Sequence, residues 1–118
     1  RHGKSITFDY GILVCLDSNH THEHVLAELE AYAPLVTPSS YCVVFDTIIE
    51  DMPKNMFSNR PWGKDNNPKT AVWEYLRLLK EEGRKAINGE QLTFDIDSMI
   101  ENKLLITVAP DGYLRRTN

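Results

Sequence analysis

Two short, uninterrupted apolar runs, each closed by an aspartate, constrain the fold of this chain more than any other feature. The first run spans residues 12–16 and ends at Asp17, and the second spans residues 41–45 and ends at Asp46. A continuous apolar run of this length is typical of a strand buried on both faces, as in a parallel sheet. Residues 21–33, which lie between the runs, carry apolar side chains at helical spacing. The sequence therefore predicts a strand, a helix and a second strand.

Such a unit has a right-handed crossover and two parallel strands. In open α/β sheets, ligands bind beyond the carboxyl ends of the strands. Asp17 and Asp46 are therefore predicted to lie at one rim of the sheet. Two carboxylates at such a rim can hold a hard cation such as Mg²⁺, or they can orient a hydroxyl of a substrate or cofactor. The alternative is that each aspartate only caps the helix that follows it.

The remaining chain adds a long loop, a helix and further strands. Residues 47–66 lack a clear periodicity, which is typical of a lid or a binding loop. Asn67 and Pro68 then have the pattern of a helix start, and Gly83 is a natural stop. Strands are expected at 92–96 and 104–109, with 113–115 returning as a hairpin arm.

These expectations place the chain in the α/β class. Strands joined by links as short as those of the last part cannot be parallel neighbours, so we expect an antiparallel pair at the sheet edge. Helices should pack on the sheet, and residues 1–118 should form one domain, which is a partial one.

Composition and charge argue against a nucleic-acid partner and a membrane span. The net charge is −4 and no run of Lys or Arg exceeds two residues, so a nucleic-acid partner is not expected. No apolar run approaches the roughly 20 residues needed to span a bilayer. Cys15 and Cys42 are each expected to be reduced core thiols, with a disulfide between neighbouring strands as the alternative. We expect a cytoplasmic location.

Three histidines follow the first predicted strand. His20 lies three residues past Asp17, where an imidazole can serve as a general base or contact a cofactor. Together with His22 and His24 it suggests a zinc site. The run is, however, one residue short of the H-x-H-x-D-H spacing of metallo-β-lactamase-like zinc hydrolases. In a helix starting near Thr21, His22 would also point away from the other two. His22 and His24 are therefore expected to be solvated residues of the first helical turn.

The predicted loop carries an aromatic residue among polar neighbours, a combination that suits binding of a sugar or an aromatic ring. The alternative is that the tryptophan only holds the loop against the core. Glu50 and Asp51 are expected to face solvent, with the addition of a carboxylate to the site as the alternative. The candidate binding residues of this region are Arg60, Trp62, Lys64, Asp65 and Asn67.

The glycines fall at positions 3, 11, 63, 83, 89 and 112, and no two of them form a G-x-G pair. A nucleotide-type cofactor needs a glycine-rich turn after the first strand of its fold, and this sequence has none. The chain also lacks a G-x-S-x-G elbow and a phosphate-binding lysine loop.

Several separated segments resemble a known family. The stretch 35–46, LVTPSSYCVVFD, resembles the turn into the fifth strand of class I S-adenosylmethionine-dependent methyltransferases, with Ser39-Ser40 in place of the usual Gly-Gly. The resemblance narrows to the cephalosporin hydroxylase/rhamnosyl O-methyltransferase family over roughly residues 12–116. The segments that carry it are LDSNHTHEHVLAEL (16–29), VFDT (44–47), RPWG (60–63), NNPKTAV (66–72) and ITVAPDGYL (106–114).

This resemblance implies the carboxyl-terminal half of a Rossmann-like methyltransferase sheet, whose last four strands lie in this chain. It also implies S-adenosylmethionine as cofactor and a divalent cation near the acceptor, with Mg²⁺ as the expected ion. Asp17 and Asp46 match acidic residues beside the metal in related metal-dependent methyltransferases. Some family members have Glu-Asp at the end of the fifth strand, whereas this chain has Phe45-Asp46 and so lacks one oxygen ligand.

On this reading the candidate residues take the following roles. His20 and Asp46 are catalytic, and Asp17 and Asp46 bind the metal. The cofactor is contacted by Asp17, Ser18 and His20, and the acceptor by Thr47, Trp62 and Asn67. Since the cofactor-binding strands and glycine-rich turn are not in this sequence, the isolated chain is expected to be inactive.

Three functions are open at this stage. The first is an O-methyltransferase that acts on a saccharide or another small hydroxylated acceptor. The second is a non-catalytic half-domain or an interaction module, which could form a homo-oligomer through the edge of the first strand. The third is a metal hydrolase built on the histidines.

Overall fold

The computed structural model describes residues 11–102 and 107–118. In chain order the elements are β1 (Val14–Leu16), α1 (His22–Tyr32), η1 (Ala33–Leu35), β2 (Tyr41–Val44), η2 (Thr47–Asp51), α2 (Pro68–Glu81), β3 (Phe94–Ile96), α3 (Ser98–Asn102) and β4 (Tyr113–Arg116). None of the described helices is long and apolar enough to cross a lipid bilayer.

A mixed four-stranded sheet, ordered β1-β2-β4-β3, forms the centre of the protein. β1 pairs in parallel with β2, with Leu16 opposite Val44, whereas β4 runs antiparallel to both β2 and β3. The predicted α/β class is confirmed, together with the parallel pair and an antiparallel pair at the sheet edge.

The late strands differ from the prediction. Residues 107–109 are not a strand, and 104–106 lie outside the described residues. Tyr113–Arg116 is not a hairpin arm to that segment, because it lies between β2 and β3 and pairs with both. β4, which is distant from β2 in sequence, thus lies inside the sheet next to it. A local sequence pattern does not reveal pairing between such distant strands.

Local capping signals set the helix boundaries, as predicted at Asn67 and Gly83. Thr21 accepts a hydrogen bond from the His24 backbone N–H and caps α1. α2 begins with a reciprocal capping box, in which Asn67 accepts from the Thr70 backbone N–H and Thr70 Oγ1 accepts from the Asn67 backbone N–H. Past the end of α2, Gly83 has a φ of 78°, a left-handed conformation that glycine adopts without strain.

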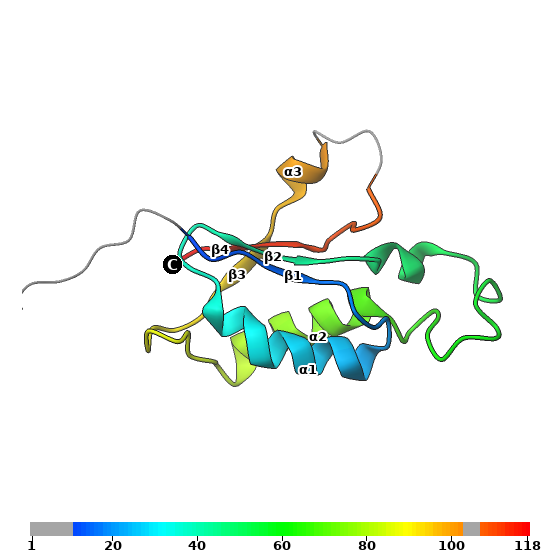
Figure 1. Cartoon of the computed structure of the whole chain (residues 1–118), viewed down its shortest axis with the longest axis horizontal. Helices are drawn as coiled ribbons and strands as arrows, with labels where there is room; N and C mark the ends of the chain where they lie inside the picture. Colours follow the sequence, from blue (N-terminus) through cyan, green and yellow to red (C-terminus); the bar gives the residue numbers. More distant parts are fainter. Residues whose placement is uncertain (1–10, 103–106) are drawn as a thin grey trace, which may run out of the picture.

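α1 and α2 lie side by side on one face of the sheet, while the short α3 lies on the other (Figure 1). The core therefore forms in one layer, between the sheet and the two long helices. Its fully buried side chains include Leu29, Val36, Cys42, Val44, Val72, Tyr75, Leu92 and Leu114.

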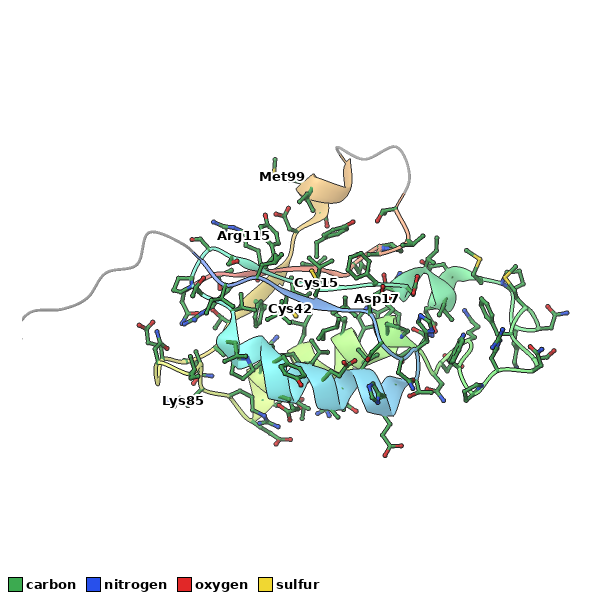
Figure 2. The ribbon with its side chains drawn as sticks, viewed as in Figure 1. Cys15, Asp17, Cys42, Lys85, Met99 and Arg115 are labelled. Carbon is green, nitrogen blue, oxygen red and sulfur yellow. The ribbon has the colours of Figure 1, made fainter. Side chains whose placement is uncertain are left out.

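The prediction that the first strand is buried on both faces is wrong within the described residues. Cys15 is exposed, since no described helix covers its face of β1, whereas Cys42 lies in the core (Figure 2). Both thiols are free, so the alternative of a disulfide is not borne out. Burial raises the pKa of the Cys42 thiol to about 12, which keeps it protonated and unreactive.

The loop that follows η2 is held to the start of α2 by a buried carboxylate. Glu50 is 8% exposed, which corrects the expectation that it faces solvent. It accepts hydrogen bonds of 2.8 Å from the Asp65 backbone N–H and the Asn67 side-chain amide, and Lys64 lies 3.7 Å away. Burial alone would raise the pKa of Glu50, but these donors outweigh it and hold the pKa below its usual value.

Gly112 is required where the backbone of β4 approaches β2. Its carbonyl accepts the Val44 N–H at 2.8 Å, and a Cβ at Gly112 would lie 2.2 Å from the Val44 carbonyl oxygen. Gly112→Ala should therefore lower the free energy of unfolding by about 1–3 kcal/mol in urea titrations followed by circular dichroism. Gly63→Ala is the matched control, since no atom lies within 4 Å of its added Cβ. Equal effects of the two changes would contradict this account.

Glu50→Gln should lower the free energy of unfolding by about 1–3 kcal/mol at pH 7, because charge-assisted hydrogen bonds are lost. A carboxylate whose folded pKa is depressed stabilises the protein above its unfolded pKa, which is near 4.5. The difference between wild type and variant should shrink as the pH falls below that value. Urea titrations from pH 7 to pH 3 measure it. A difference that does not depend on pH would show that the Glu50 charge has no such role, and the exposed Glu82→Gln is the control.

Candidate functional site

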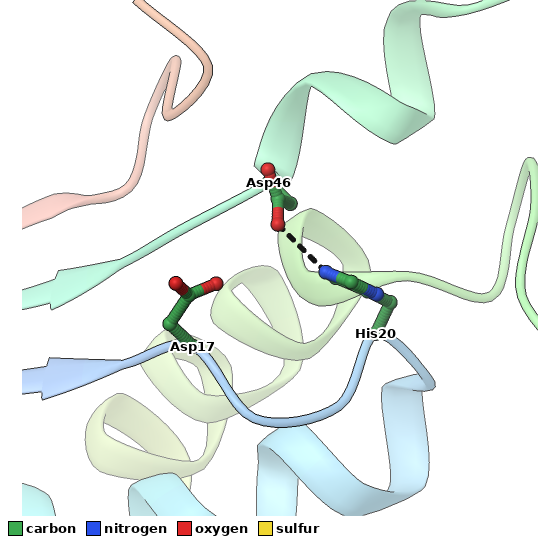
Figure 3. A group of neighbouring side chains, drawn as sticks. All are labelled: Asp17, His20 and Asp46. Carbon is green, nitrogen blue, oxygen red and sulfur yellow. Dashed lines mark hydrogen bonds and ion pairs between the residues drawn. The ribbon is translucent and has the colours of Figure 1, made fainter.

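Asp17 and Asp46 reach the same rim because β1 and β2 are parallel and in register. Asp17 directly follows β1, and the backbone bond from Phe45 N–H to the Leu16 carbonyl extends the pairing beyond β2. Both carboxylates point into the space between the strand ends, where His20 also lies (Figure 3). Ligand atoms of the three side chains all lie within 4.8 Å of one another.

The backbone of Asp46 makes the turn that places its carboxylate. Its φ of 60° and ψ of 25° are left-handed, a conformation that aspartate tolerates better than most residues. Such backbone strain is concentrated at functional sites, where the surrounding structure must hold it in place. The left-handed conformation of Asp46 turns the chain from β2 into η2 at the rim of the sheet.

His20 is positioned by the turn that precedes α1. The Asn19 side-chain oxygen accepts hydrogen bonds of 2.9 Å from both the backbone N–H and the hydroxyl of Thr21, which shapes this turn. His20 Nε2 then lies 2.6 Å from Asp46 Oδ2, and about a third of each side chain is exposed. Because a carboxylate only accepts, the proton of this bond belongs to Nε2, and the neutral ring keeps its lone pair on Nδ1.

The tryptophan of the loop lies against this histidine. The ring centroids of His20 and Trp62 are 4.6 Å apart with an interplanar angle of 65°, an edge-to-face arrangement. Both rings line a pocket of about 490 Å³, together with Asp46. The remaining wall consists of Ile48, Ile49, Met52, Phe57 and Arg60. The volume lies in the range of small-molecule sites.

Asp17, His20 and Asp46 form a donor set that fits a divalent cation. Two carboxylates suit Mg²⁺, which prefers oxygen ligands. An imidazole nitrogen would extend the set towards Mn²⁺ and other first-row metals once it carries no proton. Asp17 itself is exposed at the rim, so a cation there would keep water ligands.

Three predicted site residues are engaged elsewhere. The Ser18 hydroxyl donates a hydrogen bond of 2.9 Å to Glu28 Oε2. Glu28 belongs to α1 and is not part of the rim cluster. Thr47 is fully buried, and its hydroxyl donates to the Pro110 carbonyl at 2.5 Å. Asn67 is fully buried as the cap of α2. Thr47 and Asn67 thus support the site in this structure without lining the pocket.

The three histidines do not converge. His22 Nδ1 lies 2.8 Å from Thr70 Oγ1 on α2, while His24 lies 3.6 Å from Glu28 on its own helix. Only His20 turns to the rim, because it precedes the helix whereas the other two are wound into its first turn. The described residues therefore provide no three-histidine zinc site, and the hydrolase alternative loses its basis.

Sequence reasoning missed most of the apolar wall of the pocket. Ile48, Ile49 and Met52 belong to η2 or its end, and Phe57 lies in the loop. The available signal was the excess of apolar residues in a segment read as a loop. Its meaning depends on the direction in which η2 leaves the strand, which no local pattern gives.

A family model described as rhamnosyl O-methyltransferase/CmcI matches residues 4–117, a range that contains every residue of the pocket and the rim. Comparisons with curated proteins and with solved structures give no significant match. The family match is longer than the resemblance read from the sequence and agrees with it. Since it spans almost the whole chain, this protein belongs to the rhamnosyl O-methyltransferase/CmcI family, a family of methyltransferases.

Proposed function

We propose that this chain carries the acceptor site of an S-adenosylmethionine-dependent O-methyltransferase that acts on a saccharide or another small hydroxylated molecule. One observation supports this above all others. In a member of an O-methyltransferase family, a His20–Asp46 pair and a second carboxylate meet at a strand rim and open into a small-molecule pocket. Neither a nucleic-acid nor a membrane partner is part of the proposal, and a cytoplasmic location stays a prediction.

His20 and Asp46 are the proposed catalytic residues. S-adenosylmethionine, when bound, supplies an electrophilic methyl group for the acceptor oxygen. Methylation of a hydroxyl requires removal of its proton, and His20 Nδ1 is the atom proposed to take it. Asp46, 2.6 Å from Nε2, then stabilises the imidazolium that forms. The main contribution of the pocket is to orient the hydroxyl, which can lower the barrier by about 7 kcal/mol in favourable cases.

Asp17 and Asp46 are the residues proposed to hold the cation. A bound cation would lower the pKa of the acceptor hydroxyl and orient its oxygen. The missing second acidic residue, at the position of Phe45, leaves the site with fewer protein oxygens. We therefore propose weak binding of Mg²⁺, with water completing the coordination.

The residues that the structure describes do not make a complete S-adenosylmethionine site. The sequence has no glycine-rich turn, and of the residues expected to contact the cofactor only Asp17 and His20 turn to the rim, while Ser18 is bound to Glu28. We propose that a segment outside this sequence supplies the remainder, so that the isolated chain is inactive.

Calorimetry with S-adenosylmethionine, with and without Mg²⁺, tests the proposal on this chain and on any longer product of the same gene. The expected result is binding and methyl transfer to hydroxylated acceptors by the longer product only. No binding by either protein would refute the methyltransferase proposal.

In an active protein, Asp46→Asn should lower the rate of methyl transfer at least about 100-fold, because the imidazolium and the cation both lose a charged partner. Asparagine tolerates the left-handed backbone of this position, so folding should be retained, which circular dichroism can verify. Asp95→Asn, on the outer strand β3, is the control and should retain full activity. If the rate is unchanged in Asp46→Asn, the proposed site is misplaced.

A second candidate function is an interaction module, which the unpaired edge of the described sheet at β1 favours. β1 forms the end of the described sheet, and Ile12 and Leu13 beside it are 44% and 55% exposed. Cys15 is exposed on the same strand. An unpaired apolar edge of this kind can pair with a second copy of the chain.

If the module function holds, size-exclusion chromatography with light scattering should give twice the monomer mass of 13.5 kDa. Leu13→Lys should then return the protein to a monomer, because a charge is placed in the paired edge. Ile87→Lys, at a residue that is 75% exposed and lies outside the strands, should leave the mass unchanged. A wild-type mass of one chain at all concentrations would exclude self-association.

A further inference from the structure

The pocket beside the His20–Asp46 pair is lined by a few polar and many apolar residues. His20, Asp46 and Arg60 are its polar lining residues, whereas the rest of the lining is apolar or aromatic. A neutral sugar carries hydroxyl groups all around its ring. Each hydroxyl that an apolar wall leaves unpaired costs about 1–3 kcal/mol, so such a ring suits this pocket poorly.

Arg60 is held over the face of the pocket tryptophan. Its guanidinium carbon lies 5.7 Å from the Trp62 ring centroid, within the range of a cation–π interaction. Trp62 in turn contacts the His20 ring at 4.6 Å. The Trp62 ring therefore contacts both the Arg60 guanidinium and the imidazole of the catalytic pair.

The guanidinium has no carboxylate partner in the part of the chain that the structure describes, since no ion pair within 4.0 Å involves Arg60. The two lysines near the same loop differ in this respect. Lys64 lies 3.7 Å from Glu50, and Lys69 lies 2.9 Å from Asp51. The local carboxylates therefore neutralise the lysines and leave the arginine at the pocket available to a ligand.

We infer that the pocket takes an anionic acceptor, a hydroxylated molecule with a flat apolar body and an acidic group that binds Arg60. The inference rests on the proposed methyltransferase function and names the class of its acceptor. A guanidinium binds carboxylate, sulfate or phosphate through two parallel hydrogen bonds. The flat body lies along Trp62 and the apolar wall, and the hydroxyl of the acceptor then faces His20, which lines the same pocket.

A matched pair of probes tests the inference: 3,4-dihydroxybenzoate and its methyl ester, which differ in charge but share the ring and both hydroxyls. Binding is measured by calorimetry on this chain, in buffer with EDTA so that no cation bridges the hydroxyls to the rim. The acid should bind about tenfold more tightly than the ester or better, because charged hydrogen bonds are the stronger ones. Equal affinities, or no binding of the acid, would overturn the inference.

Variants at one position assign the effect to the guanidinium. Arg60→Gln should remove the preference for the acid and leave the affinity for the ester unchanged, while Arg60→Lys should retain part of the preference. Lys54→Gln, in the same loop but outside the pocket lining, is the control and should behave as wild type. A preference for the acid that persists in Arg60→Gln would also overturn the inference.

The two proposals fail in distinguishable ways. If the acid binds through Arg60 but no S-adenosylmethionine-dependent methyl transfer is found in any longer gene product, the acceptor class stands and the reaction fails. If methyl transfer proceeds to neutral saccharides at the same rate in wild type and Arg60→Gln, the reaction stands and the anionic acceptor fails.

Discussion

The parallel pairing of β1 with β2 is the constraint on which the site depends. With Leu16 opposite Val44, the two strands end together, and each is followed within two residues by an aspartate. A shift of one residue in this register would turn the apolar side chains of one strand away from the core. The packing of the core against α1 and α2 therefore also fixes the separation of the carboxylates.

The site itself is built in the connections beyond the strands. Asp46 adopts a left-handed backbone, and His20 lies in the turn before α1, so neither is held by regular secondary structure alone. Their 2.6 Å hydrogen bond joins the two connections. The loop that carries Trp62 is fastened through Glu50, whose buried carboxylate binds the cap of α2. Rigid anchors of this kind allow a loop to hold a side chain in a functional position.

The two faces of the sheet differ in the described helices that cover them. α1 and α2 bury one face, whereas Cys15, Arg115 and Met99 lie on the other side, where α3 is the one described helix (Figure 2). Parallel strands in α/β proteins are normally covered on both faces. The described residues thus leave one face of β1 without the covering layer that this class of sheet usually has.

The amino-acid sequence by itself determined the parts of the protein that local rules control. The apolar runs, the helical spacing after Thr21, the cap at Asn67 and the stop at Gly83 predicted the first strands and both long helices, and the position of Asp17 and Asp46 after the runs predicted their common rim. Only the tertiary structure decided the rest. β4 lies between β2 and β3, Cys15 is exposed, Glu50 is buried and the pocket wall is apolar, because each depends on contacts between segments that no local pattern links.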